Sequence, residues 1–80
     1  MVVKDAVVLR FQKLCKKEGI KYNELANRSG VTPSTVYSLM NCSRRDVSIR
    51  TIKVLCDGLH MSLGEFFSSE EFDQLEQEIY

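Results

Sequence analysis

Apolar side chains recur at every third or fourth position along most of the chain, a spacing that places them on one face of an α-helix. Alternation of the kind that marks a β-strand is almost absent. The positions that we expect to face a core are Val7, Phe11, Leu14, Cys15, Leu25, Ala26, Val36, Leu39, Met40, Ile49, Ile52, Leu55, Cys56, Leu59, Phe66 and Phe67. The pattern predicts an all-α fold of short helices.

Capping residues mark where these helices begin and end. Asp5 is the expected N-cap of the first helix, and Gly19 can take the left-handed conformation that ends it. Thr32 is expected to cap a helix whose first residue is Pro33, because the first amide of a helix has no intrahelical acceptor to lose. Two further serines are expected N-caps, Ser48 and Ser62.

Two positions near the end of the pattern carry more specific expectations. Gly58 lies inside the fourth helix, where glycine costs up to about 1 kcal/mol relative to alanine, so we expect a close backbone contact there. Ser68 and Glu71 have the spacing of a capping box, which predicts a last helix over 69–79. Its apolar stripe is narrow and consists of Phe72, Leu75 and Ile79.

The segment from Tyr22 to Met40 has the pattern of a helix-turn-helix. A short helix over 22–29 ends at Gly30, and a second over 33–40 opens with Thr32-Pro33. The side of this second helix that does not face the core carries hydroxyls, one phenol and an amide, all of which can donate and accept hydrogen bonds. These residues are Ser34, Thr35, Tyr37, Ser38 and Asn41, and the basic run Ser43-Arg44-Arg45 follows them.

Charge is divided unevenly between the two ends of the chain, although the net charge is zero. All 11 lysines and arginines lie between Lys4 and Lys53, a stretch that contains only four acidic residues. From Val54 onward there are seven acidic residues and no lysine or arginine. This asymmetry favours a nucleic-acid-binding basic part with an acidic tail, although a salt-bridged surface would give the same composition.

Several other classes of protein are disfavoured. The longest apolar run is Ala6–Leu9, far short of the ~20 residues of a membrane span, and Asp5 interrupts any secretion signal at the start. Three cysteines without a C-x-x-C spacing indicate reduced thiols and a cytoplasmic location. Cys56 and His60 are spaced i, i+4, but the chain has no other histidine, so Cys56 is better explained as a core residue than as a metal ligand. We expect no enzymatic activity, cofactor or small-molecule ligand.

Residues Ile20 to Phe67 resemble the lambda-repressor and Cro type of DNA-binding domain, also called the xenobiotic-response-element family. The resemblance is carried by Leu25-Ala26, Gly30-Val31-Thr32, Val36, Leu39, Leu55-Cys56, Leu59 and Ser62-Leu63-Gly64-Glu65-Phe66. It implies a compact fold of five short helices whose third helix lies in the DNA major groove, here followed by a short acidic sixth helix. The implied organisation is a helix-turn-helix domain over 1–67 and an acidic helix or tail over 68–80.

The resemblance also implies the residues that contact DNA. The base-facing positions of the family are occupied by Thr32, Pro33, Ser34, Tyr37 and Ser38. The positions implied to contact phosphates are occupied by Tyr22, Asn41, Ser43, Arg44 and Arg45. Tyr22 replaces a glutamine that the family often uses, and its hydroxyl can serve the same purpose.

Three positions depart from the family pattern. An arginine–glutamate pair common in the family is replaced by Cys15 and Met40, which leaves no unpaired buried charge. The usual glycine after the third helix is Cys42, and a frequent base-contacting glutamine is Pro33. The fold is compatible with all three changes, and Pro33 removes a direct base contact that the family often makes.

Taken with the charge pattern, these features predict a sequence-specific transcriptional regulator, a repressor that binds double-stranded DNA at a palindromic operator through the helix over 33–40. The alternative is a protein-interaction module, antitoxin-like or an adaptor, that keeps the same fold. The acidic tail either packs on its own domain, supplies a weak homodimer contact, or competes with DNA for the basic face. The residues considered for the dimer contact are Phe66, Phe67, Phe72, Leu75 and Ile79.

Overall fold

A computed structural model describes residues 3–41 and 47–75 of the chain. These two stretches form six helices and contain no strand, so the predicted all-α fold is confirmed. The helices are α1 (Val3–Glu18), α2 (Tyr22–Ser29), α3 (Pro33–Met40), α4 (Ile49–Gly58), α5 (Leu63–Phe67) and α6 (Glu70–Asp73).

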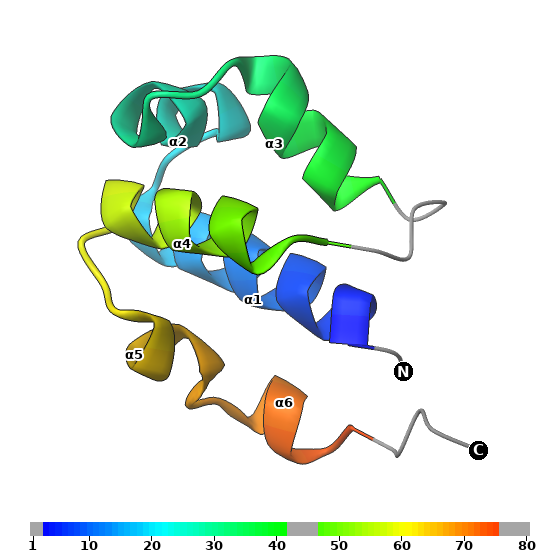
Figure 1. Ribbon diagram of the computed structural model, residues 1–80. Helices are drawn as coiled ribbons and strands as arrows, with labels where there is room; N and C mark the ends of the chain where they lie inside the picture. Colours follow the sequence, from blue (N-terminus) through cyan, green and yellow to red (C-terminus); the bar gives the residue numbers. More distant parts are fainter. Residues whose placement is uncertain (1–2, 42–46, 76–80) are drawn as a thin grey trace.

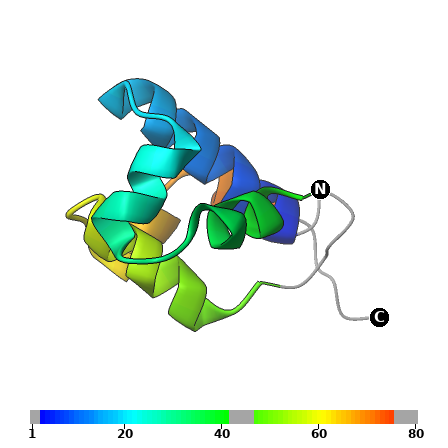
Figure 2. The same ribbon diagram turned by 90° about the horizontal axis from the view of Figure 1, so that it is seen from above.

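The helices are arranged in three levels (Figure 1). α1 and α4 form the middle level, α2 and α3 lie on one side of it, and α5 and α6 lie on the other. Seen from above, α2 and α3 lie across the level formed by α1 and α4 (Figure 2). The two helices of the helix-turn-helix are therefore held on one side of the molecule, and the acidic end of the described chain lies on the opposite side.

The core contains side chains from the first five helices. Phe11 of α1 and Phe66 of α5 are fully buried, and their ring centroids are 4.5 Å apart. Cys56 is also fully buried, as expected for a core residue. The buried cluster consists of Val7, Phe11, Cys15, Leu25, Ala26, Val36, Leu39, Ile52, Leu55, Cys56, Leu59 and Phe66. Met40 packs against this cluster, so both departures from the family's ion pair, Cys15 and Met40, are accommodated as apolar residues.

Gly58 makes the close backbone contact that the sequence predicts. A Cβ atom at this position would lie 3.0 Å from the backbone nitrogen of Ser29 and 3.1 Å from its Cα. The end of α4 therefore packs directly on the end of α2, which only glycine allows without a shift. Gly19 also behaves as predicted, with a left-handed φ of 67° after α1.

Two expectations about the helix ends are wrong. α1 begins at Val3, so Asp5 lies in its first turn and is not the N-cap; there its charge still suits the positive end of the helix dipole. Ile49 is 60% exposed, although its spacing matches the inward face of α4. Ile49 is the first residue of that helix and extends past the edge of the core that Ile52 and Leu55 enter.

The last helix is much shorter than predicted. α6 contains four residues, its N-cap is Ser69, and the chain leaves the helical conformation after Gln74. The predicted capping box does not form the start of this helix, because Glu71 is instead buried and paired with Lys13 of α1. The remainder of the predicted helix over 69–79, including Ile79, lies outside the described residues beyond Leu75.

In the described part of the chain, every helix is too short or too polar to cross a bilayer.

Candidate DNA interface

The turn between α2 and α3 is built by backbone geometry and by two buried anchors. Gly30 ends α2 in the left-handed conformation, with a φ of 72°, and the amide of Val31 donates to the carbonyl of Ala26 at 3.1 Å. Ala26 and Val36 are fully buried on either side of this turn. α3 is thus fixed against α2 by its inner face, and its outer face is left free for a ligand.

The start of α3 carries a small cluster of hydroxyls. Thr32 takes the extended N-cap conformation as predicted, but its side chain makes no capping hydrogen bond to the helix backbone. Its Oγ1 atom lies 2.9 Å from Oγ of Ser34 and 3.1 Å from Oγ1 of Thr35 instead. These hydroxyls can each turn to donate or accept, which suits base edges of either polarity.

The five residues expected to face DNA bases all lie at the surface of the turn and of α3. Val36 and Leu39 point into the core, and the exposed side therefore carries the intervening positions. The exposed residues are Thr32, Pro33, Ser34, Tyr37 and Ser38. None of the residues of α3 is charged, so this surface has no long charged side chain that would keep a base edge at a distance.

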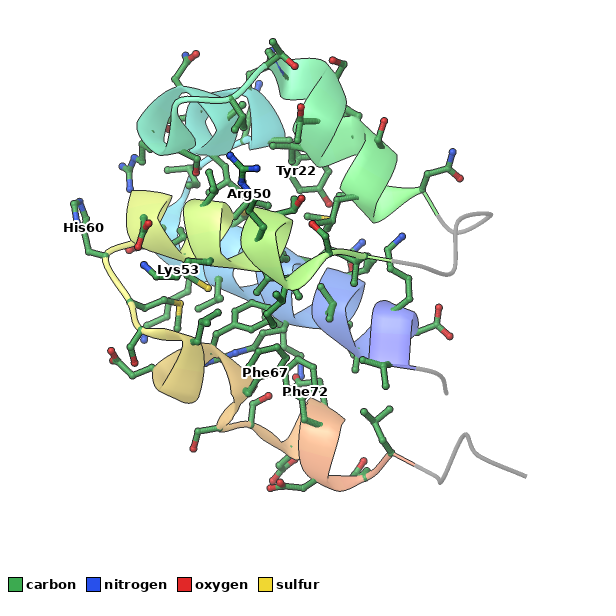
Figure 3. The ribbon with its side chains drawn as sticks, in the orientation of Figure 1. Tyr22, Arg50, Lys53, His60, Phe67 and Phe72 are labelled. Atoms are coloured by element: carbon green, nitrogen blue, oxygen red, sulfur yellow. The ribbon has the colours of Figure 1, made fainter. Side chains whose placement is uncertain are left out.

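An aromatic pair joins the start of α2 to the outer side of α3. The rings of Tyr22 and Tyr37 meet edge to face, with centroids 5.6 Å apart and an interplanar angle of 77°. Tyr22 (labelled in Figure 3) is half-buried and packs against the core. Tyr37 is 53% exposed. This contact between two helices cannot be inferred from the spacing of residues along either of them.

A groove between α3 and α4 extends the polar surface beyond the predicted residues. Its walls carry Ser38 on one side and Ser48 and Thr51 on the other. Oγ of Ser48 accepts the backbone amide of Thr51 at 3.1 Å, which confirms Ser48 as the N-cap of α4. Arg50 is exposed one residue before Thr51 and extends toward the α2–α3 side of the molecule (Figure 3). Arg50 and Thr51 are not identified from the sequence, although both lie in the first turn of a helix with a clear N-cap, Ser48.

The far end of α3 is tied to α1. Asn41 is exposed at the C-cap of α3, and its carbonyl accepts a hydrogen bond from Nζ of Lys4 at 3.3 Å. Lys4 is itself only 3% exposed. The backbone of Asn41 is thus held by a hydrogen bond from a buried lysine of α1. Ser43, Arg44 and Arg45, which were expected to contact phosphates, lie outside the described residues.

The ionisable groups away from α3 include a buried thiol and two ion pairs within helices. Burial is the main cause that raises the pKa of the Cys56 thiol to about 11, so this thiol stays protonated at neutral pH. Among residues 3–41 and 47–75, no group of three or more histidine, cysteine or acidic side chains could hold a metal ion. Lys53 and Asp57 form an ion pair along α4, and Glu24 and Arg28 form one along α2.

The comparison with protein families agrees with this geometry. A model of the Cro/C1-type HTH DNA-binding domain matches residues 10–71, from within α1 to within α6. Comparison with curated proteins and with solved structures gave no significant match. Because the family match covers well over half of the chain, the protein belongs to the Cro/C1-type helix-turn-helix DNA-binding family. It is a DNA-binding regulator, and its expected partner is DNA.

Proposed function

We propose that the protein is a sequence-specific transcriptional repressor that inserts α3 into the major groove of its operator. The observation that supports this proposal most strongly is the outer face of α3, where small uncharged donors and acceptors are exposed on a helix fixed by its buried side. An α-helix of this kind fits the major groove, in which each base pair presents a distinct pattern of donors and acceptors.

The residues divide into two proposed groups. Thr32, Pro33, Ser34, Tyr37 and Ser38 face the base edges, and they determine which sequence is bound. Tyr22, Asn41, Ser43, Arg44 and Arg45 contact backbone phosphates, and they determine affinity and register. The exposed position of Arg50 beside the groove between α3 and α4 supports adding it to the phosphate group.

We further propose that two copies bind a palindromic operator and repress by occupying it. One recognition helix covers only a few base pairs, and a single module of this size buries roughly 600–1,000 Å² on DNA, at the low end for specific binding. A second copy related by a two-fold axis doubles this area. The two α3 helices would then lie about 34 Å apart, one turn of B-DNA.

The surface proposed for the contact between copies must be revised. Phe66 is fully buried and packs on Phe11, so it cannot contact a second copy in the folded protein. Phe67 and Phe72 keep part of their surface exposed, and their rings contact each other with centroids 4.8 Å apart. Together with half-buried Leu75 they form the apolar patch that we propose for a weak homodimer.

The alternative function, a protein-interaction module of the antitoxin or adaptor kind, is favoured by one observation. The absence of any charge on α3 suits a protein surface as well as a base edge. Salt dependence separates the two functions. Phosphate contacts release counterions, so the logarithm of the DNA affinity falls steeply with the logarithm of salt concentration, whereas docking of an uncharged helix on a protein does not.

The decisive experiment is a selection of bound sequences from random DNA, followed by salt titration of the selected site. We expect one enriched sequence with two-fold symmetry and a steep negative salt slope. The DNA-binding function would be refuted if no sequence is enriched and the DNA affinity does not change with salt concentration. That result would favour the protein-interaction module.

Variants then test the two residue groups. Arg44→Ala and Arg45→Ala should weaken binding to operator and random DNA equally, each reducing the salt slope by about one. Ser38→Ala should change the preferred bases and leave the salt slope unaltered. If Ser38→Ala affects operator and random DNA to the same extent, Ser38 does not read bases.

A further inference from the structure

The outer face of α3 is polar except at Pro33, the first residue of the helix, and at Tyr37. Ser34, Ser38 and Asn41 are exposed, and each presents a hydroxyl or an amide. Tyr37 is the one large hydrophobic side chain of this helix that is exposed, at 53% of its surface. A phenol ring on a face made mostly of small polar groups needs an apolar partner in the complex, because its ring carbons would otherwise displace water from base edges without compensation.

The position of Tyr37 on the helix is asymmetric. Thr35 and Ser38 line the groove toward α4, whereas the Tyr37 ring contacts Tyr22 at the start of α2. The ring therefore lies along the α2 edge of the proposed reading face. Its edge-to-face contact with a half-buried neighbour limits its rotation before any ligand binds. A side chain that is already ordered loses little entropy on binding, which is the condition for a selective contact.

Base edges in the major groove offer one apolar group to such a ring. Thymine carries a C5-methyl group there, whereas cytosine, adenine and guanine present only donors and acceptors. We propose, resting on the proposed DNA-binding function, that Tyr37 is a specificity-determining residue that contacts the C5-methyl group of a pyrimidine, thymine or 5-methylcytosine, in each half-site. Tyr22 is then a positioning residue that holds the Tyr37 ring in place.

The test removes only the methyl group. After selection of the operator, each thymine is replaced in turn by deoxyuridine, which keeps the base pairing and loses the methyl. Binding is measured by fluorescence anisotropy at fixed salt. We expect one thymine of the half-site at which deoxyuridine weakens wild-type binding roughly four-fold, the effect of leaving one methyl-sized group unburied.

Variants assign that effect to Tyr37. Tyr37→Phe keeps the ring and should keep the difference between thymine and deoxyuridine, whereas Tyr37→Ser should abolish it at that one position. Tyr22→Phe should also keep the difference, and Tyr22→Ser should reduce it. Circular dichroism and thermal melting of each variant establish that it is folded. The same thymine can also be replaced by cytosine or by 5-methylcytosine, each with guanine opposite. The operator with 5-methylcytosine should bind the wild-type protein more tightly than the operator with cytosine.

Two results would overturn the proposal. One is wild-type binding that is insensitive to deoxyuridine at every position of the selected operator. The other is a Tyr37→Ser variant that weakens operator and random DNA equally and retains the wild-type response to deoxyuridine, which would place Tyr37 on the sugar-phosphate backbone. Failure of the proposed function itself looks different, because then the selection yields no preferred sequence on which to make these substitutions.

Discussion

At the scale of single residues, the positions that matter most are those where two helices approach closely. Gly58 lets the end of α4 lie against the backbone of Ser29, and α4 and α2 are in direct contact as a result. Gly64 makes no comparable approach, since the nearest atom to a Cβ there would be Oγ of Ser62 at 3.8 Å. Of these two helical glycines, a close approach of backbones requires glycine at position 58 and not at position 64.

We predict opposite effects on stability for alanine at these two positions. Gly58→Ala should lower the free energy of unfolding by about 1–3 kcal/mol, because the new methyl group overlaps the backbone of Ser29 and forces α2 and α4 apart. Gly64→Ala should be neutral or stabilising by up to about 1 kcal/mol, because alanine favours a helix and meets only an ordinary contact. Urea unfolding measures both, and a Gly58→Ala variant as stable as the wild type would contradict the close approach.

At the scale of elements, the short helices α5 and α6 are held by α1. Helices of five and four residues are not stable alone in water. α5 begins with a complete capping box between Ser62 and Glu65, as predicted for the cap, and its last carbonyls accept hydrogen bonds from Arg10. α6 is held by the ion pair between Glu71 and Lys13. One side of α1 therefore fixes the whole C-terminal part of the described chain.

The Arg10 contact gives a second prediction. Its guanidinium donates from Nε to the carbonyl of Phe66 at 2.9 Å and from a terminal nitrogen to the carbonyl of Glu65 at 3.0 Å. Arg10→Ala should lower the free energy of unfolding by about 1.5–3 kcal/mol, the range for a hydrogen bond to a charged group. Arg10→Lys should recover only part of this loss, because an ammonium group does not reproduce the forked geometry. An Arg10→Ala variant as stable as the wild type would show that the two carbonyl contacts contribute nothing.

The Glu71 contact gives a prediction about acid. Its pairing with Lys13 is the main cause that lowers the pKa of Glu71 from 4.5 to about 2. Because the pKa is lower in the folded protein, this carboxylate stabilises the fold above its ordinary pKa. The contribution is lost as the pH falls from about 4.5 to about 2. Glu71→Gln should therefore destabilise the protein at neutral pH and be nearly equal to the wild type near pH 2.

Glu70→Gln is the matched control, since Glu70 is exposed in the same helix and no ion pair of the described chain includes it. Its effect on thermal unfolding should be small and should not follow the same pH window. A wild-type and a Glu71→Gln protein with parallel pH profiles would rule out the ion pair as a source of acid sensitivity.

The sequence predicts the helices well where apolar spacing and capping residues agree, and poorly where a tertiary contact decides. α2 and α3 are bounded by Gly30, Thr32 and Pro33, which act locally, and both form where they are expected. The capping pattern at Ser68 and Glu71 fails because Glu71 pairs with a lysine 58 residues away. For the same reason the exposed hydroxyls of α3 are predictable from spacing, whereas the contact between Tyr22 and Tyr37 is not.

At the scale of the whole molecule, charge is separated across the three levels of the fold. The seven acidic residues after Val54 include those of α5 and α6, which lie on the side opposite α2 and α3 (Figure 1). The acidic helix α6 is thus turned away from the proposed DNA face, so its described part does not compete with DNA for that face. In the field of DNA this separation favours approach with the helix-turn-helix first.

The two-fold arrangement can be tested at the same scale. At saturating protein, a footprint on the selected operator should cover two half-sites whose centres are about 34 Å apart, one helical turn. Free in solution, self-association should be weak and should increase with salt, because the acidic residues of two copies repel each other. Sedimentation measures this association, and a footprint limited to one half-site would refute the dimer. Phe67→Ser should weaken cooperative binding, and unchanged cooperativity would place the interface elsewhere.

The contacts of α1 also determine when the fold can be completed during synthesis. Its Phe11 packs on Phe66, and its Arg10 and Lys13 bind partners 55 to 58 residues later in the chain. At a translation rate of roughly 5–20 residues per second, several seconds pass between the emergence of α1 and that of α5 and α6. During this interval the apolar face of α1 remains incompletely covered on the ribosome. The nascent helix-turn-helix therefore emerges before its core is closed, and final consolidation of the domain awaits the emergence of α5 and α6.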